Sequence, residues 1–188
     1  MEIRSASLRV HLRNLKNEDA PVLAAIANNY AIAKNLNVNF PYPYTEKNAM
    51  DFINHSNEKF LQKQEMHFGI INETHKLIGV IGLHEMDYND KKCDIGIWIG
   101  SAYQGFGYST EAYKLLLGFA LYNLNFNRVY TFVFPSNHIS LKTLKKIGFV
   151  EEGLLRENAM DHEGKFSDQI ILGLLRKEYK DTTEIIVR

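Results

Sequence analysis

The turn Gln-Gly-Phe-Gly-Tyr-Ser at residues 104–109 constrains the fold of this chain more than any other stretch. An apolar segment, Ile95–Ile99, precedes the turn, and a helical pattern that opens with Thr110 follows it. A strand, a glycine turn and a helix in this order bring consecutive backbone N–H groups together at a helix N-terminus. The turn is therefore predicted to bind an anion such as a pyrophosphate.

The turn differs from the better-known nucleotide-binding loops. It contains neither G-x-x-x-x-G-K-[ST] nor a G-x-G-x-x-G with an acidic residue about 20 positions later. What remains is Gln-x-x-Gly-x-Ser at residues 104–109. Taken alone, this pattern also fits an ordinary strand-to-helix turn.

A second motif follows a predicted β-branched and aromatic strand at Arg128–Phe134. It reads Asn137-x-x-Ser140 and opens a short helix whose apolar residues are Leu141, Leu144 and Ile147. Gly148 then stands where a helix commonly ends in a left-handed residue. A strand, a polar turn and a helix therefore occur a second time in this chain.

Together the two motifs resemble those of the GNAT acyltransferase superfamily, whose [Gln/Arg]-x-x-Gly-x-[Gly/Ala] loop holds the pyrophosphate of acetyl-CoA. With Leu-His-Glu-Met-Asp at 83–87 and Ile-Gly-Ile-Trp-Ile at 95–99, their order is similar to that of the RimJ/RimL-type protein N-acetyltransferases. The resemblance covers roughly residues 8–179. It implies one GNAT domain over 1–188, with a mixed α/β fold. Its central, mostly antiparallel sheet would have about seven strands, splayed in the middle and flanked by helices.

Composition is that of one ordinary globular α/β domain: 188 residues, 45% hydrophobic and 23% charged. The formal net charge of zero gives no electrostatic reason to expect nucleic acid or an anionic membrane as a partner. No apolar run approaches the roughly 18 residues of a membrane span, and no signal peptide is evident. The single cysteine, Cys93, suits a reducing cytosol, so a cytoplasmic protein is expected. The histidines lack metal-ligand spacing, and no metal site is expected.

Patterning predicts a strand, two helices, three strands, a helix, a strand, a helix and two strands. The first helix carries an apolar stripe from Leu23 to Tyr30, and Thr45 caps the second. The helix after the glycine turn is expected from Thr110 to about Leu124. Between the first two helices, Phe40–Tyr44 (Phe-Pro-Tyr-Pro-Tyr) should be an extended aromatic loop.

The resemblance also implies roles for individual residues in holding acetyl-CoA. Backbone groups of Ile97, Trp98 and Ile99 would bind the pantetheine arm and polarise the thioester carbonyl. Asn137 would hydrogen-bond the same arm, or else only cap the following helix. Lys145 would meet the outer phosphates, unless it belongs to a solvated basic face. The pyrophosphate loop would comprise Gln104, Gly105, Phe106, Gly107, Tyr108, Ser109 and Thr110, with Ser109 standing where the family has Gly or Ala.

Acetyl transfer to an amine also needs a proton for the leaving thiolate and a base for the amine. Many GNAT enzymes use a Tyr seven residues after the Asn as the acid, but that position is Leu144 here. Ser140 is the candidate acid in its place. The base is left open among Asp94, Glu85 and His84. Adjacent residues of a strand face opposite ways, so at most one of His84 and Glu85 should face the site.

The sequence is therefore interpreted as an acetyl-CoA-dependent N-acetyltransferase that transfers the acetyl group directly. The resemblance favours the α-amine of a protein N-terminus as acceptor, and a homodimer is left open. A small amine, such as a polyamine, amino acid or antibiotic, is the alternative acceptor. A catalytically weak, regulatory acyl-CoA-binding module is the alternative from another class. The Phe40–Tyr44 loop would either grip the acceptor or pack onto its own core.

Overall fold

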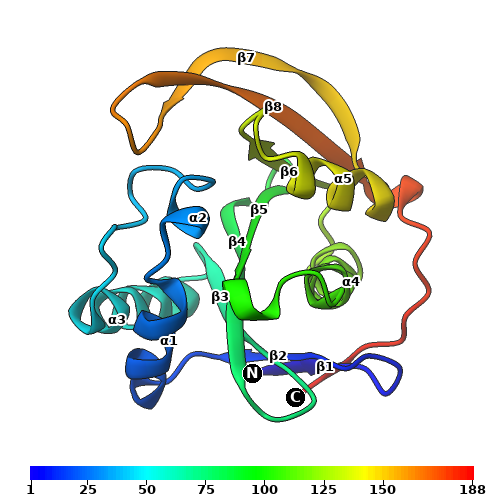
Figure 1. The fold of residues 1–188 in the computed structure, drawn as a ribbon. Helices are drawn as coiled ribbons and strands as arrows, with labels where there is room; N and C mark the ends of the chain where they lie inside the picture. Colours follow the sequence, from blue (N-terminus) through cyan, green and yellow to red (C-terminus); the bar gives the residue numbers. More distant parts are fainter.

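One nine-stranded sheet runs through the computed structural model, which describes residues 1–188 (Figure 1). The strands lie in the order β7-β8-β6-β5-β4-β3-β2-β1-β9, and every neighbouring pair except β5–β6 is antiparallel. Their bounds are β1 Glu2–Arg4, β2 His11–Asn14, β3 Met66–Ile71, β4 Leu77–Asp87, β5 Lys92–Ile99, β6 Arg128–Val133, β7 Val150–Met160, β8 Phe166–Leu175 and β9 Ile186–Val187.

The two central strands, β5 and β6, separate along their length. They pair only where Lys92–Asp94 runs beside Arg128–Tyr130, and beyond these residues the ladder stops. The rest of β5 and β6 therefore leaves one edge of each strand without a neighbouring strand. This confirms the predicted splayed, mostly antiparallel sheet.

The sheet has two strands more than the seven expected. β1 and β9 pair with each other at the far edge, where the Glu2 amide donates to Arg188 and the Arg188 amide donates to Glu2, at 2.8 and 2.9 Å. Both lie outside the range of residues that resembles the family. Their pairing brings the two ends of the chain together (Figure 1).

Helices cover both faces of the sheet. Of the five α-helices, the first three lie to one side of β3–β5, and α4 lies on the other side with α5 beside it (Figure 1). No helix is both long enough and apolar enough to cross a membrane. Their bounds are α1 Ala20–Ala27, α2 Tyr30–Ala33, α3 Glu46–Leu61, α4 Tyr108–Gly118 and α5 His138–Ile147.

Two helices differ from their predicted bounds. The first was expected to reach Tyr30, but it ends at Ala27 because two asparagines redirect the chain. Asn28 Oδ1 accepts a hydrogen bond from the Tyr44 amide, and Asn29 caps α2 by accepting from Ala31. Helix α4 begins at Tyr108 rather than Thr110, and a π-helical turn, Phe119–Asn123, extends it.

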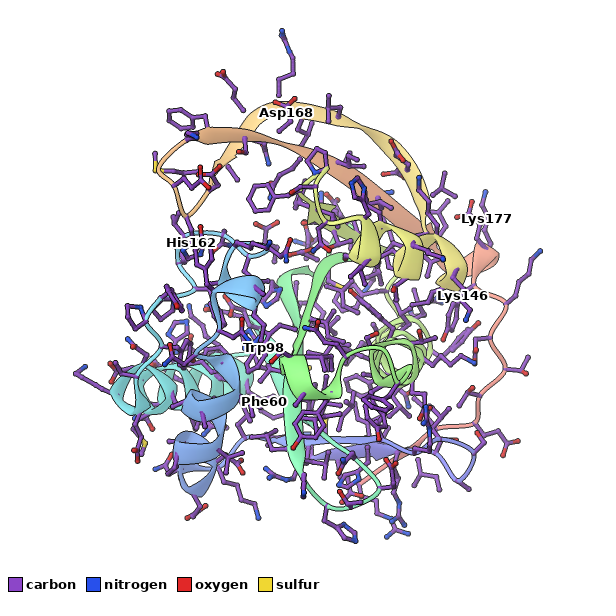
Figure 2. All side chains as sticks on the ribbon, viewed as in Figure 1. Phe60, Trp98, Lys146, His162, Asp168 and Lys177 are labelled. Atoms are coloured by element: carbon purple, nitrogen blue, oxygen red, sulfur yellow. The ribbon has the colours of Figure 1, made fainter.

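The core consists of two apolar clusters separated by the sheet. The larger packs α4 against the sheet, and Leu115, Leu116 and Phe119 are buried there as predicted. The smaller joins α1 and α3 to the opposite face. Figure 2 shows Trp98 near the middle of the molecule, with Lys146 and Lys177 towards its outer edge. The gap between β5 and β6 therefore opens in the interior of the fold.

Candidate active site

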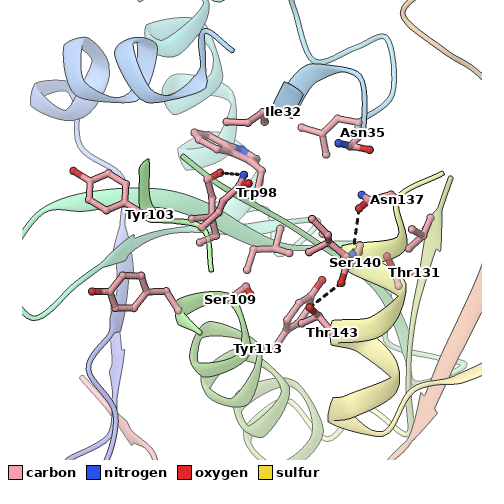
Figure 3. A pocket seen from close by; sticks show the side chains of 18 of the residues that line it. Ile32, Asn35, Trp98, Tyr103, Ser109, Tyr113, Thr131, Asn137, Ser140 and Thr143 are labelled. Atoms are coloured by element: carbon pink, nitrogen blue, oxygen red, sulfur yellow. Dashed lines mark hydrogen bonds between the residues drawn. The ribbon is translucent and has the colours of Figure 1, made fainter. Parts of the chain in front are cut away.

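A cavity of about 320 Å³ occupies the gap between the diverging strands (Figure 3). Residues 96–99 of β5 and 131–133 of β6 form two of its walls, and residues of α4, α5 and the α2 region complete it. None of the residues that line it is an Asp, Glu, Lys, Arg or His. The cavity is thus closed by neutral side chains and by strand edges with free backbone groups.

The glycine turn has the conformation of an anion cradle. Gly105 and Gly107 have φ angles of +83° and +86°, which only glycine adopts without strain. Gly107 is also the N-cap of α4, so the turn leads directly into the positive end of a helix. Gln104 fixes the turn to β5 because its side-chain amide donates to the Ile99 carbonyl at 2.8 Å.

Most of the predicted loop residues reach the cavity. Gln104, Gly105, Gly107, Tyr108 and Ser109 line it. Phe106, whose side chain is 60% exposed, and Thr110 are absent from the wall. The roles predicted for Phe106 and Thr110 can therefore involve only the outer part of the loop.

Arg9 supports the turn from a distant part of the sequence. Its Nη2 donates to the Phe106 carbonyl at 2.8 Å, and its Nε donates to Glu111 Oε1 at 2.8 Å. Its guanidinium also lies 5.0 Å from the centre of the Tyr108 ring. Because Glu111 lies in the first turn of α4, Arg9 neutralises a carboxylate close to the cradle. Nothing in the motif itself indicates this residue.

The free edge of β5 can accept an extended ligand. The Gly100 amide donates to Ile78 of β4 at 2.8 Å. Since amides alternate along a strand, those of Ile97 and Ile99 point the opposite way, towards the gap. The ladder to β6 has ended before these residues, so both amides are available. This arrangement fits the role that the sequence predicts for the Ile97–Ile99 segment towards a pantetheine arm.

Asn137 both caps α5 and faces the cavity. Its Oδ1 accepts from the Ser140 amide at 3.2 Å, which is the capping role considered as the alternative. Its amide nitrogen makes no hydrogen bond within the protein. The hydroxyl of Ser140, which also lines the cavity, makes no hydrogen bond within the protein either. Capping and ligand binding are therefore compatible, because they use different atoms of Asn137.

Sequence reasoning missed the wall formed by the α2 region. Ala31, Ile32, Asn35 and Leu36 line the cavity, whereas no residue of Phe40–Tyr44 does. The break at Asn28–Asn29 brings this segment over the gap, and the two asparagines are the signal that could have revealed it. Tyr113 of α4 and Thr131 of β6 are two further wall residues that no motif contains.

The aromatic loop is largely directed inwards. Tyr44 is only 5% exposed, and the Phe40 ring lies 5.8 Å from that of Trp98. Only Tyr42 remains open, at 48% exposure and 5.3 Å from the Tyr30 ring. Of the two alternatives for this loop, packing onto its own core describes Phe40 and Tyr44.

The three base candidates lie beside the cavity rather than in its wall. His84 Nδ1 is 3.5 Å from Asp94 Oδ2, and both are on the same face of the sheet as Gly96, a wall residue. Glu85 stands at an irregularity of β4 with a φ of +46°, where it accepts a 2.6 Å hydrogen bond from the Tyr130 hydroxyl. His84 and Glu85 thus have separate partners, Asp94 and Tyr130.

Two further side chains are accounted for by the structure. Lys145, expected at the outer phosphates, lies 2.7 Å from Glu151 and is absent from the cavity wall. Cys93 is fully buried in the larger core cluster, and burial raises the pKa of its thiol to about 12. Cys93 is therefore a packing residue with no thiolate character. No group of three or more His, Cys, Asp or Glu side chains gathers where it could hold a metal ion.

Comparison with known proteins decides the family. A family model described as an acetyltransferase (GNAT) domain matches residues 9–150. The chain belongs to the GNAT acetyltransferase family. It is 33% identical over 173 residues to the uncharacterized N-acetyltransferase p20 of Bacillus licheniformis, covering 91% of this chain and 95% of p20. It is therefore an acetyl-CoA-dependent N-acetyltransferase.

Two other GNAT proteins bear on the branch and the acceptor. The spermidine N(1)-acetyltransferase of Vibrio cholerae is 25% identical over 173 residues, covering 92% of this chain and 96% of that enzyme. The structure of Mycobacterium smegmatis RimJ in complex with CoA-disulfide superposes with a TM-score of 0.86 at 19% identity, covering 96% and 88%. The fold agrees with the RimJ/RimL-type resemblance of the sequence motifs.

Proposed function

We propose that this GNAT enzyme acetylates the α-amine of a peptide or protein N-terminus. The observation that carries the proposal is the absence of charged side chains from the cavity wall. A peptide N-terminus brings one ammonium, which must lose its proton before it reacts, followed by a polar backbone and one side chain. A neutral wall with scattered hydrogen-bonding groups suits such a substrate, because no carboxylate in the wall itself would stabilise the ammonium form.

In this proposal each wall serves one part of the reaction. The cradle at 104–109 holds the pyrophosphate, and the Ile97 and Ile99 amides bind the arm and polarise the thioester carbonyl. The Asn137 amide nitrogen hydrogen-bonds the same arm. The nitrogen–carbon bond then forms as the carbon–sulfur bond breaks, and Ser140 gives its proton to the departing thiolate. The acceptor enters beside Ile32, Asn35 and Leu36, because the early helices flank the acceptor side in this family.

A small amine is the second candidate, and the relationship to the spermidine enzyme favours it. A polyamine carries several ammonium groups, and sites for such ligands need carboxylates or aromatic faces to offset the loss of solvation. The wall includes aromatic side chains, such as Trp98 and Tyr113, that one ammonium could face, but it provides no carboxylate for the others. The neutral wall is therefore the reason to place the peptide acceptor first.

An acceptor panel tests the proposal. Thiol release from acetyl-CoA would be measured with peptides bearing small first residues, with the same peptides blocked at the N-terminus, with spermidine and with an aminoglycoside. Free peptides should be turned over and blocked ones should not, even when they contain lysine. Preference for spermidine or the aminoglycoside over every free peptide would overturn the proposal. Tight acetyl-CoA binding without thiol release from any acceptor would favour the regulatory module.

A pair of variants then tests where the acceptor binds. Leu36→Ala should raise the KM of the peptide several-fold, because Leu36 lines the cavity, while the Kd of acetyl-CoA stays within about two-fold. Val38→Ala is the matched control, since Val38 is 44% exposed and absent from the wall. An unchanged peptide KM in Leu36→Ala would place the acceptor elsewhere.

A further inference from the structure

Three titratable side chains form a continuous row beside the cavity. His67, His84 and Asp94 lie on the adjacent strands β3, β4 and β5, and the pairings His67↔Gly82 and His84↔Asp94 place them on one face of the sheet. His84 Nε2 is 2.9 Å from His67 Nε2, and His84 Nδ1 is 3.5 Å from Asp94 Oδ2. Both ring nitrogens of His84 are thus engaged, one at each end of the row.

Two glycines make room for the row. A Cβ at Gly82 would lie 2.6 Å from His67 Cδ2, and a Cβ at Gly96 would lie 3.0 Å from His84 Cε1. Each imidazole therefore lies over a position where the sheet has no side chain. Because Gly96 also lines the cavity, the row begins directly behind the cavity wall. Asp94 Oδ1 is buried there and has no hydrogen-bond partner.

The far end of the row is buried and stays neutral. His67 is only 8% exposed, and its ring lies 5.1 Å from that of Phe52 on α3. Burial lowers the pKa of His67 to about 3, with smaller contributions from the charges of His84 and His55. Its one carboxylate neighbour is Glu65, at 3.7 Å from Nε2. His67 therefore remains an uncharged imidazole at neutral pH.

We infer that His84 receives the proton of the acceptor amine, with His67 holding it in the reactive tautomer and Asp94 stabilising the imidazolium that forms. The inference rests on amine acetylation and is independent of which amine is used. The two Nε2 atoms share one hydrogen bond, which needs one donor and one acceptor. With neutral His67 accepting at its Nε2, the proton of neutral His84 lies on the Nε2 of His84. The basic site of His84 is then Nδ1, next to Asp94. The 3.5 Å between Nδ1 and Asp94 Oδ2 is longer than the roughly 2.8 Å of a charge-assisted hydrogen bond, so this pair can shorten when Nδ1 takes up the proton.

The proton balance is complete without any other reagent. The ammonium gives one proton, through Asp94 or a water molecule, to His84 Nδ1, and the resulting imidazolium is paired with Asp94. The free amine then attacks the thioester carbonyl, and the carbon–sulfur bond breaks. The amine nitrogen loses a second proton as the amide forms, and the departing thiolate gains one proton, so these two changes balance. His84 then releases the first proton to solvent. Glu85 is instead engaged by the Tyr130 hydroxyl, which donates a hydrogen bond to it.

The first test reads the tautomer directly and needs no substrate. In protein labelled with 15N on histidine, NMR titration should show His84 protonated on Nε2 throughout, with Nδ1 taking up the proton as the pH falls. His67 should remain neutral above about pH 5, given its lowered pKa. A resting His84 with its proton on Nδ1, or a His67 that titrates first, would overturn the inference even if the acceptor proposal were wrong.

The second test uses pH profiles of variants with acetyl-CoA and whichever amine the panel identifies. His84→Gln should lower kcat by about 10²-fold or more and abolish the acid limb, whereas Asp94→Asn should lower kcat and displace the acid limb to lower pH. His67→Phe should lower kcat by about ten-fold and displace that limb, and His67→Gln, which can still accept a hydrogen bond, should recover part of the loss. Acetyl-CoA affinity should stay within about three-fold in all four variants.

His55→Gln is the matched control, because His55 is an exposed histidine on α3 near the row and lies outside it. It should keep the wild-type profile. An unchanged acid limb in His84→Gln would refute the role of His84. If His67→Phe and His67→Gln lowered kcat equally and left the acid limb of the pH profile in place, His67 would be only a packing residue.

Discussion

Gly107 is the residue on which we expect acetyl-CoA binding to depend most. Its φ of +86° is a conformation that favours glycine. As the N-cap of α4, it also lies at the helix end where the pyrophosphate is expected to bind. Gly107→Val should raise the Kd of acetyl-CoA by about 10- to 100-fold, because a β-branched residue in this region costs about 1–3 kcal/mol. Gly107→Asn should retain more affinity, since asparagine tolerates the left-handed region.

Calorimetric titration of the folded variants decides this prediction. Gly118→Ala is the control, because Gly118 lies within helix α4 and an added Cβ would make only ordinary contacts with Ile185, at 3.5 Å. That variant should bind acetyl-CoA as the wild type does. Equal affinity of the valine and asparagine variants would show that backbone conformation at Gly107 is unimportant to the cradle.

His67 should also make stability depend on pH. An unfolded histidine takes up its proton near pH 6.5, whereas burial delays this in the folded protein to about pH 3. Between these values only the unfolded state gains the proton. The contribution of His67 is therefore fully present above about pH 6.5, and the free energy of unfolding falls as pH decreases, by up to about 1.4 kcal/mol per unit.

Urea unfolding at about pH 7 and about pH 5 measures this slope. His67→Phe should be less sensitive to pH than the wild type, because it removes the buried group and keeps an aromatic ring beside Phe52. His138→Phe, at an exposed position on α5, should retain the wild-type slope. Parallel pH dependences for the wild type and His67→Phe would contradict the burial argument.

At the scale of elements, the start of α4 is held from outside its own motif. Arg9 donates to the Phe106 carbonyl and to Glu111, so one side chain fixes the turn and neutralises the first turn of the helix. Arg9→Met should raise the Kd of acetyl-CoA by about ten-fold, since Glu111 would then repel the pyrophosphate. Adding Glu111→Gln to Arg9→Met should recover part of this loss.

A double-mutant cycle on acetyl-CoA binding, run at low and high salt, measures the coupling. Arg156→Met, which removes an exposed arginine from β7, is the control for the change in net charge. Strictly additive effects of Arg9→Met and Glu111→Gln would mean that the pair does not act on the ligand as a unit.

Prediction from sequence was most successful where a site is local. The cradle at 104–109 and the cap at Asn137 each depend on a few consecutive residues, so their spacing reveals them. The α2 wall is not predicted, because the apolar stripe through Tyr30 indicates one continuous helix, whereas side chains of Asn28 and Asn29 end that helix. The contact between His67 and His84 could not be predicted, because it depends on the register of two strands and on glycines that make room for both rings.

At the scale of the whole molecule, the strand pairing that joins the two ends of the chain lies far across the sheet from the cavity at β5 and β6. Four strands lie between the splayed strand β5 and the terminal strand β9. β9 closes the far edge on β1, and Ile185 just before it lies against Gly118 of α4. The last residues therefore hold the ends of the chain together, at the opposite side of the sheet from β6.

Deleting residues 183–188 should lower the Tm by about 5 °C, because it removes the β9 ladder and the packing of Ile185, worth about 1–2 kcal/mol together. The Kd of acetyl-CoA should stay within about two-fold at temperatures where the shortened protein is folded. The Asp181–Lys114 ion pair, at 2.7 Å, is retained and still anchors the chain to α4. Ile185→Ala in the full-length chain separates lost packing from lost strand pairing. A ten-fold weaker Kd in the folded, shortened protein would show instead that the terminal strand controls the opening between β5 and β6.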